Sequence, residues 1–175
     1  VLIVTRFFEI QKNIKSALRI WKNIELYGIH DWKLEIVGYG QDENMLREYA
    51  KQINLTNYEF KGKSNNVYPY YEHASIFMMT SNYEGFGMTI LESQSCGCVP
   101  IVMDKFSVVH DLITDNINGV IGSIDEAEYV KQLVRLILDK NQRMYMGQNA
   151  IISSKRYNSD KIYEMWQTLI NSYGR

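Results

Sequence analysis

The sequence predicts an α/β protein in which a doubly wound parallel sheet of about six strands is followed by a helical tail. Short apolar stretches rich in Val, Ile and Phe alternate with amphipathic stretches up to Gly122. Parallel strands that are covered on both faces need such apolar runs, and the helices between them need an apolar stripe. After Gly122 the sequence shows helical periodicity alone.

Each element is assigned from its pattern of apolar residues. Strands are expected at residues 1–7, 33–37, 58–61, 75–80, 99–103 and 119–121. Helices are expected between them, near 14–24, 42–53, 67–74, 88–96 and 108–114, and in the tail at 125–140, 141–157 and 159–173. The last helix has an apolar stripe that packs either on this domain or on a partner, because such a stripe does not name its partner.

Composition sets the size and class of the protein. The chain has 175 residues, of which 46% are hydrophobic, and a formal net charge of -1. This length fits one domain with a sizeable core, so we expect a single domain over 1–175 with its helical tail at about 125–175. The near-neutral charge argues against nucleic acid as a partner. No apolar run reaches the length that spans a bilayer.

The cysteines and histidines suggest no metal or redox chemistry. Cys96 and Cys98 are too close in sequence for an ordinary disulfide, and no His or Cys cluster has the spacing of a metal site. We interpret both cysteines as small buried residues at a helix-to-strand turn, in a reducing cytoplasm.

The most informative segment runs from Ser81 to Glu92, between a predicted buried strand and a predicted helix. Glu84 and Glu92 lie eight positions apart, with Gly85 and Gly87 between them. In an open α/β sheet this turn lies at the carboxyl end of a strand, where ligands bind. Carboxylates accept hydrogen bonds from sugar hydroxyls, and the amides of a helix start favour phosphates. The segment therefore suits a ligand with both groups, such as a nucleotide-sugar.

This segment resembles the Glu-x7-Glu signature of retaining glycosyltransferases of the GT-B fold, in particular glycosyltransferase family 4 (group 1). Further segments resemble elements of that family, in the family's order: Thr5-Arg6 with Lys12-Asn13, and residues 34–40, 95–102 and 118–121. The resemblance implies a Rossmann-like domain that forms one half of a GT-B fold, the C-terminal half that binds the sugar donor. Because the chain begins directly in an apolar strand at Val1, without Met, we expect the N-terminal acceptor domain to be absent from it.

The resemblance also implies roles for the two glutamates. Glu84 would face the donor sugar and the leaving phosphate. Glu92 would accept hydrogen bonds from the two ribose hydroxyls, because a carboxylate offers two acceptors at a matching separation. Without the resemblance, both would be ordinary acids near a helix start, where the helix dipole favours them.

Cations and backbone amides complete the implied site. Arg6, at the end of the first strand, and Lys12, at the start of the first helix, would stabilise the leaving diphosphate. The backbone cradle for the diphosphate and the hexose would comprise Gly85, Phe86, Gly87, Met88 and Thr89. Gly38 would border the base pocket. The chain departs from the family at Thr5 and Asn13, where glycine is usual or common.

The expected function is that of the donor-binding domain of a retaining, metal-independent hexosyltransferase. The donor would be a nucleotide-sugar, with UDP-hexose as the expectation, and a glycan or lipid-linked acceptor would bind the missing half. No Asp-x-Asp motif follows a strand, so no metal and no cofactor are expected. This chain alone is expected to be inactive. The expected location is the cytoplasm, with peripheral attachment to the inner membrane face through the missing half as an option.

Two alternatives remain open at this point. One is a non-catalytic α/β module, for example a receiver-like signalling domain or a nucleotide-binding regulatory domain. A receiver needs an acidic cluster after its first strand, whereas this strand ends in Thr5-Arg6. The other is a nucleotide-sugar epimerase of similar fold, which would need a catalytic set that the sequence does not show.

Overall fold

The computed structural model describes residues 1–173 and contains a six-stranded parallel sheet in the order β3-β2-β1-β4-β5-β6. The strands are β1 Leu2–Arg6, β2 Leu34–Tyr39, β3 Tyr58–Gly62, β4 Ile76–Met79, β5 Val99–Met103 and β6 Val120–Gly122. Each predicted strand is present with its ends within two residues of the expectation, which confirms the doubly wound, Rossmann-like sheet. This strand order also excludes a receiver-like domain, whose sheet runs 2-1-3-4-5.

The helices are α1 Glu9–Lys12, α2 Ile14–Leu26, α3 Glu43–Gln52, α4 Tyr68–His73, α5 Met88–Ser95, α6 Val108–Leu112, α7 Glu126–Leu138, α8 Lys140–Ser154 and α9 Ser159–Tyr173. The expectation that Lys12 starts the first helix is wrong, because Lys12 ends the short helix α1. Asn13 then takes a left-handed conformation with φ 49°, which separates α1 from α2. The helix expected at 141–157 ends at Ser154 and continues as a 3₁₀ turn over Lys155–Tyr157.

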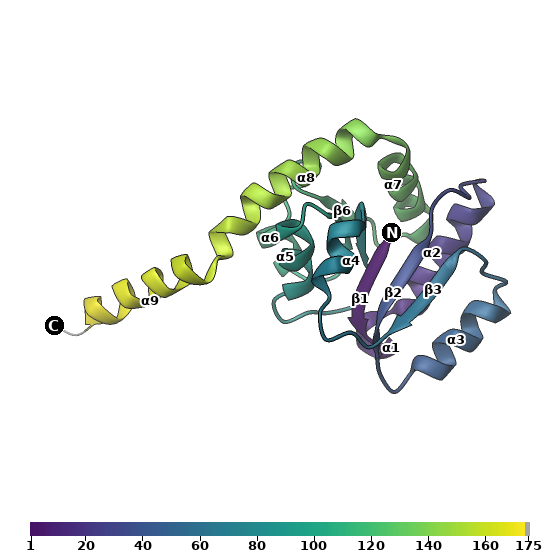
Figure 1. Cartoon of the computed structure of the whole chain (residues 1–175), viewed down its shortest axis with the longest axis horizontal. Helices are drawn as coiled ribbons and strands as arrows, with labels where there is room; N and C mark the ends of the chain where they lie inside the picture. The colour runs from purple at the N-terminus through teal and green to yellow at the C-terminus, as the bar shows by residue number, and fades with distance from the viewer. Residues whose placement is uncertain (174–175) are drawn as a thin grey trace.

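The sheet is covered on both faces, as the apolar strands require (Figure 1). Along β1, Ile3 belongs to one core, together with side chains of α2, α3 and α7. Leu2 and Val4 belong to the other core, with side chains of α4, α5 and α6. The alternation follows from the period of two in a strand. Helix α8 then crosses from α7 to pack against α5.

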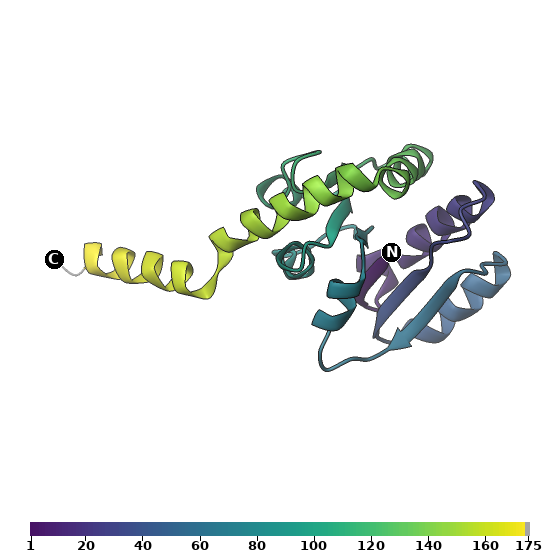
Figure 2. The same cartoon turned by 45° about the horizontal axis from the view of Figure 1, so that its top comes forward.

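Helix α9 projects away from the body of the molecule (Figures 1 and 2). None of its residues is buried. The exposed members of its apolar stripe are Ile162, Met165, Trp166, Leu169, Ile170 and Tyr173. The alternative that this stripe packs on the same domain is therefore wrong, and packing against a partner stays a prediction.

The sheet has its topological switch point between β1 and β4. The chain runs from β1 through β2 to β3 and then returns to β4 on the other side of β1. The register between β1 and β4 holds a single residue pair, Leu2 with Phe77, so the two strands diverge toward their carboxyl ends. Ligands of open α/β sheets bind outside such a switch point.

Candidate functional site

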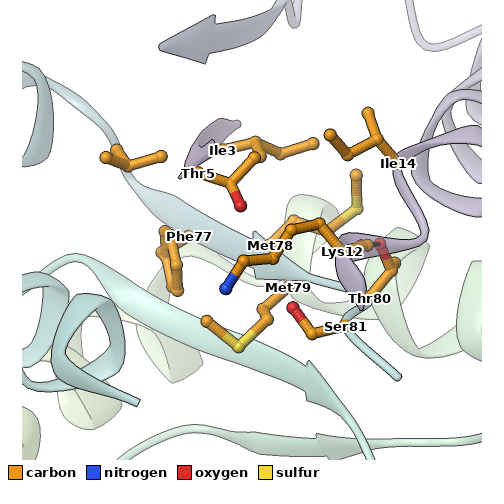
Figure 3. A pocket seen from close by; sticks show the side chains of 10 residues that line it. Ile3, Thr5, Lys12, Ile14, Phe77, Met78, Met79, Thr80 and Ser81 are labelled. Carbon is orange, nitrogen blue, oxygen red and sulfur yellow. Dashed lines mark hydrogen bonds between the residues drawn. The ribbon is translucent and has the colours of Figure 1, made fainter. Parts of the chain in front are cut away.

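A small crevice of about 10 Å³ lies between the carboxyl ends of β1 and β4 (Figure 3). Its walls come from Thr5 on β1, from β4, and from Thr80 and Ser81, which directly follow β4. The side chain of Lys12 reaches across this crevice from the end of α1 (Figure 3). The crevice at the switch point is therefore lined by the cation of Lys12 and otherwise largely by apolar side chains.

Lys12 and Glu84 form an ion pair at this crevice. The Lys12 Nζ lies 2.7 Å from Glu84 Oε1 and 2.8 Å from Oε2, and the Ser81 hydroxyl donates to Glu84 Oε1 at 2.6 Å. The side chains of Lys12 and Glu84 are only 16% and 10% exposed. Such a sheltered pair is screened by salt much less than a surface pair. The structure thus joins two of the predicted site residues that lie 72 positions apart.

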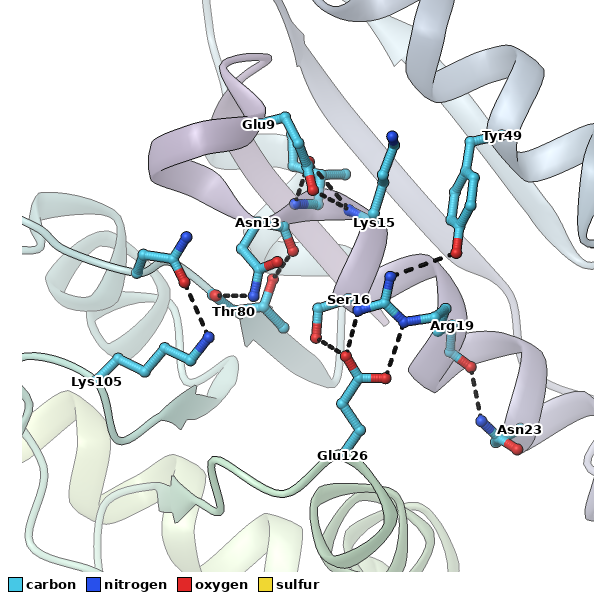
Figure 4. A network of polar contacts seen from close by, with 12 residues as sticks. Glu9, Asn13, Lys15, Ser16, Arg19, Asn23, Tyr49, Thr80, Lys105 and Glu126 are labelled. Carbon is cyan, nitrogen blue, oxygen red and sulfur yellow. Dashed lines mark hydrogen bonds and ion pairs between the residues drawn. The ribbon is translucent and has the colours of Figure 1, made fainter.

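Hydrogen bonds from side chains to backbone carbonyls keep the end of α1 and the end of β4 together (Figure 4). The Asn13 side chain donates to the carbonyl oxygen of Thr80 at 3.2 Å, and the Thr80 hydroxyl donates to the carbonyl oxygen of Asn13 at 2.9 Å. Beside them, the Asn82 side chain donates to the carbonyl oxygen of Ile10 at 2.8 Å. Asn13 tolerates the left-handed backbone that this junction needs, so it serves where glycine is common.

Helix α2 is held in turn by α7. Arg19 and the hydroxyl of Ser16 both donate to the carboxylate of Glu126 (Figure 4). Burial alone raises the pKa of Glu126, but the hydrogen bonds from Arg19 and Ser16 outweigh it and lower that pKa below its usual value. This network ties the helix that follows Lys12 to the opposite half of the sheet.

The glycine turn leads into the amino end of α5. Gly87 is the N-cap residue with φ +77°, a conformation that favours glycine. Gly85 differs, because a Cβ added there would meet nothing within 4 Å. No side chain caps the amides of the first turn of α5. Among them, the Ile90 amide donates to the carbonyl oxygen of Gly87 at 2.9 Å, whereas the amides before it lack intrahelical partners and favour an anion. Phe86 and Met88 beside this helix start are exposed.

Glu92 lies in the second turn of α5. Its Oε2 accepts a hydrogen bond from the phenol of Tyr71 at 3.0 Å. The same side chain lines a groove of about 340 Å³ between α4, α5 and the end of α8, whose other walls include Tyr68 and Lys155.

Arg6 and Gly38 occupy the paired ends of β1 and β2. The side chain of Arg6 is exposed. Gly38 pairs with Thr5 in the sheet register, and a Cβ on Gly38 would lie 1.8 Å from the carbonyl oxygen of Thr5. Packing of the two strands therefore requires glycine at this position, and contact between Gly38 and a base stays a prediction.

The sequence analysis missed two residues that hold the glutamates. Ser81 contacts Glu84 and Tyr71 contacts Glu92. For Ser81 a signal existed, since it stands three positions before Glu84 at the end of a buried strand. For Tyr71 there was none, because the contact joins two helices that only the tertiary fold brings together.

Within residues 1–173, no three side chains of His, Cys, Asp or Glu gather in an arrangement that could hold a metal ion. Both cysteines are free, and burial raises the pKa of the Cys98 thiol to about 12. In the same range, no helix combines the length and the apolar character needed to cross a membrane.

A doubly wound sheet with a charged crevice at its switch point defines the class of α/β domains that take their ligands at the strand ends. The family model described as glycosyl transferases group 1 matches residues 1–152, so the chain belongs to that family. Its structural neighbours are GT-B glycosyltransferases, whose fold it shares over one part of their length.

Three similar proteins illustrate the range of the family. The amylovoran biosynthesis glycosyltransferase AmsD of Erwinia amylovora is 31% identical over 163 residues, which are 92% of this chain and 45% of AmsD. A Campylobacter jejuni alpha-1,4-N-acetyl-D-galactosaminyltransferase, whose name specifies a diNAcBac-PP-undecaprenol glycan, is 28% identical over 158 residues, 90% of this chain and 43% of that protein. A variant of S. aureus TarM, crystallised with fondaparinux, alpha-GlcNAc-glycerol and UDP, superposes with a TM-score of 0.88 at 21% identity, over 97% of this chain and 35% of TarM. The chain spans less than half the length of each.

Proposed function

We propose that this chain is the donor-binding domain of a retaining, metal-independent glycosyltransferase that moves a hexose from a nucleotide-sugar. The observation that carries the proposal is the meeting of Lys12 and Glu84 at the switch-point crevice, next to the uncapped amino end of α5. A cation and free amides suit a diphosphate, and a carboxylate suits sugar hydroxyls. The ordered family segments support the same assignment.

The residues would act mainly by positioning and by stabilising charge. In a retaining transfer, the acceptor hydroxyl attacks the anomeric carbon on the face from which the diphosphate departs. Arg6, Lys12 and the first amides of α5 would stabilise the negative charge that grows on the diphosphate. Glu84 and Glu92 would orient the sugar and the ribose, which lowers the entropic part of the barrier.

The donor and acceptor are proposed from the similar proteins. UDP is the nucleotide in the TarM complex, and a polyprenol-linked glycan appears in the name of the Campylobacter relative. We therefore propose a UDP-hexose donor and a glycan or lipid-linked acceptor. The acceptor would bind an N-terminal half, toward which the exposed stripe of α9 would face.

The proposal is tested by a thermal-shift titration with UDP, GDP and ADP. For a dissociation constant of about 10⁻⁴ M, 10 mM of the preferred nucleotide is about 100-fold above it and stabilises the fold by about 2.7 kcal/mol. For a domain of this size that corresponds to a rise in Tm of about 5–10 °C. Arg6→Gln should reduce the rise, because Arg6 is the proposed diphosphate cation at the exposed end of β1, whereas Lys51→Gln on α3 should not. No rise with any of the three nucleotides would refute the proposal.

Glu92→Gln is expected to weaken binding of the preferred nucleoside diphosphate by about tenfold or more, because a hydrogen bond to a charged group contributes about 1.5–3 kcal/mol. Glutamine keeps an acceptor for the Tyr71 phenol, so Tm without ligand should stay close to that of the wild type. Glu92→Ala should instead also lower Tm, since it leaves the buried phenol without its acceptor. Calorimetric titration measures the affinities, and equal affinity in the Gln variant would make Glu92 an ordinary helix acid.

Nucleotide binding is expected to need no divalent metal. Lys12, Arg6 and the helix amides would supply the positive charge that Mg²⁺ gives to diphosphates elsewhere. The measurement is a titration of UDP in EDTA and in millimolar Mg²⁺ or Mn²⁺, with the expectation of equal affinities. Binding that is lost in chelator and restored by metal would contradict this part of the proposal.

A further inference from the structure

We propose that Tyr71 is a positioning residue, which holds the carboxylate of Glu92 in the orientation that reads the two ribose hydroxyls of the nucleotide. This inference rests on the proposed function and goes beyond it, because it assigns recognition of the diol to a pair of side chains rather than to Glu92 alone. The pair joins α4 to α5 across 21 positions of sequence.

The contact uses one lone pair of Oε2, which leaves Oε1 and the second lone pair of Oε2 to accept from the two ribose hydroxyls. The phenol of Tyr71 donates to Oε2 of Glu92 at 3.0 Å. Glu92 is half-buried and its side chain lines the groove of about 340 Å³ that opens between α4, α5 and the end of α8. A free glutamate loses rotamer freedom when it binds a diol, and a side chain that is already held loses less.

Tyr71 is itself fixed, as a positioning residue must be. Its side chain is fully buried, and its ring packs edge-on against Phe77 of β4 with centroids 5.8 Å apart. Burial and the adjacent charge of Glu92 raise the pKa of the Tyr71 phenol above its usual value, so the phenol stays protonated and remains a donor. The sheet therefore sets the position of the phenol, and the phenol sets that of the carboxylate.

A second buried tyrosine shows what a purely structural phenol does in this fold. Tyr129 is also fully buried, and its phenol donates to the backbone carbonyl oxygen of Ile101 at 2.8 Å, inside the core. Tyr71 instead donates to a charged side chain that borders an open groove. The two tyrosines are thus matched in burial and differ in the group that each phenol holds.

The experiment measures discrimination between a ribose diol and its absence. UDP, GDP and ADP, each with its 2′,3′-dideoxy counterpart, are titrated into the wild-type chain, Tyr71→Phe and Tyr129→Phe. For the preferred base, the wild type should bind the ribonucleotide about tenfold or more tighter than the dideoxy form, the difference expected for a charged hydrogen bond. In Tyr71→Phe this ratio should fall to about threefold or less, with affinity for the dideoxy form unchanged. Tyr129→Phe should lower Tm yet keep the wild-type ratio.

A double variant separates positioning from a general loss of structure. If Tyr71 acts through Glu92, Tyr71→Phe should change the ratio in the wild-type background and leave it unchanged in the Glu92→Gln background. Additive losses in the two backgrounds, or a wild-type ratio in Tyr71→Phe, would overturn the inference and leave the proposed function standing. Binding of all three nucleotides without any preference for the diol would overturn it too. Absence of nucleotide binding by the wild type would instead refute the proposed function itself.

Discussion

Gly38→Ala is expected to lower the free energy of unfolding by more than about 4 kcal/mol. Losses of this size arise when a new side chain overlaps atoms that the fold cannot move away. A Cβ at this position would lie 1.8 Å from the carbonyl oxygen of Thr5, and φ there is +149°. The overlapping atom belongs to the backbone, so no side chain can turn away. The paired ends of β1 and β2 would have to separate, including Arg6, which pairs with Tyr39.

The matched control is Gly85→Ala, because a Cβ there meets nothing within 4 Å. Its free energy of unfolding in urea should stay within about 0.5 kcal/mol of the wild type. Any effect of Gly85→Ala should appear in nucleotide affinity, since the turn borders the proposed diphosphate position. A Gly38→Ala protein with wild-type stability would show that the strand ends can separate at little cost.

Under the proposed function, the 175-residue chain is expected to bind a nucleoside diphosphate and to transfer no sugar. The chain spans 45% of the length of AmsD, and the apolar stripe of α9 is exposed. An acceptor that is not held against the donor loses the contribution of orientation, which can supply roughly 7–11 kcal/mol of rate acceleration.

Incubation of the chain with labelled UDP-hexoses and candidate glycan or lipid-linked acceptors, followed by separation of the products, checks this expectation. The nucleotide titration on the same sample is the control that the site is folded. Efficient formation of a glycosylated product would mean that this chain holds a complete acceptor site, and that a second half is dispensable.

The order of elements was predictable because its causes are local. Apolar runs mark buried parallel strands, and helical spacing of apolar residues marks the helices that cover them. All six strands were placed within two residues in this way. The short segment from Ser81 to Glu92 could also be placed at a strand-to-helix turn, since glycine and the following helical pattern lie next to each other in sequence.

The break at Asn13 was not predictable from the same signals. The apolar stripe of α2 begins at Ile14, but nothing in it indicates that residues 9–12 form a separate turn. At Asn13, which has a left-handed conformation, the side-chain amide donates to the carbonyl oxygen of Thr80. The hydroxyl of Thr80 donates in return to the carbonyl oxygen of Asn13. Those partners are 67 positions away, so tertiary contact decided the end of α1 and the direction of Lys12.

By itself, then, the sequence determined the class of fold, the order of its strands along the chain and the family-like segments that carry Glu84, Glu92, Arg6 and Lys12. Only the tertiary structure decided the contacts of these side chains: Lys12 with Glu84, Ser81 with Glu84, and Tyr71 with Glu92. It also decided that α9 stands clear of the domain. The physical reason is that the periodicity of a sequence reports only which face of each helix or strand is apolar. A hydrogen bond between two elements depends in addition on the order of the strands in the sheet and on the face of the sheet that each helix covers.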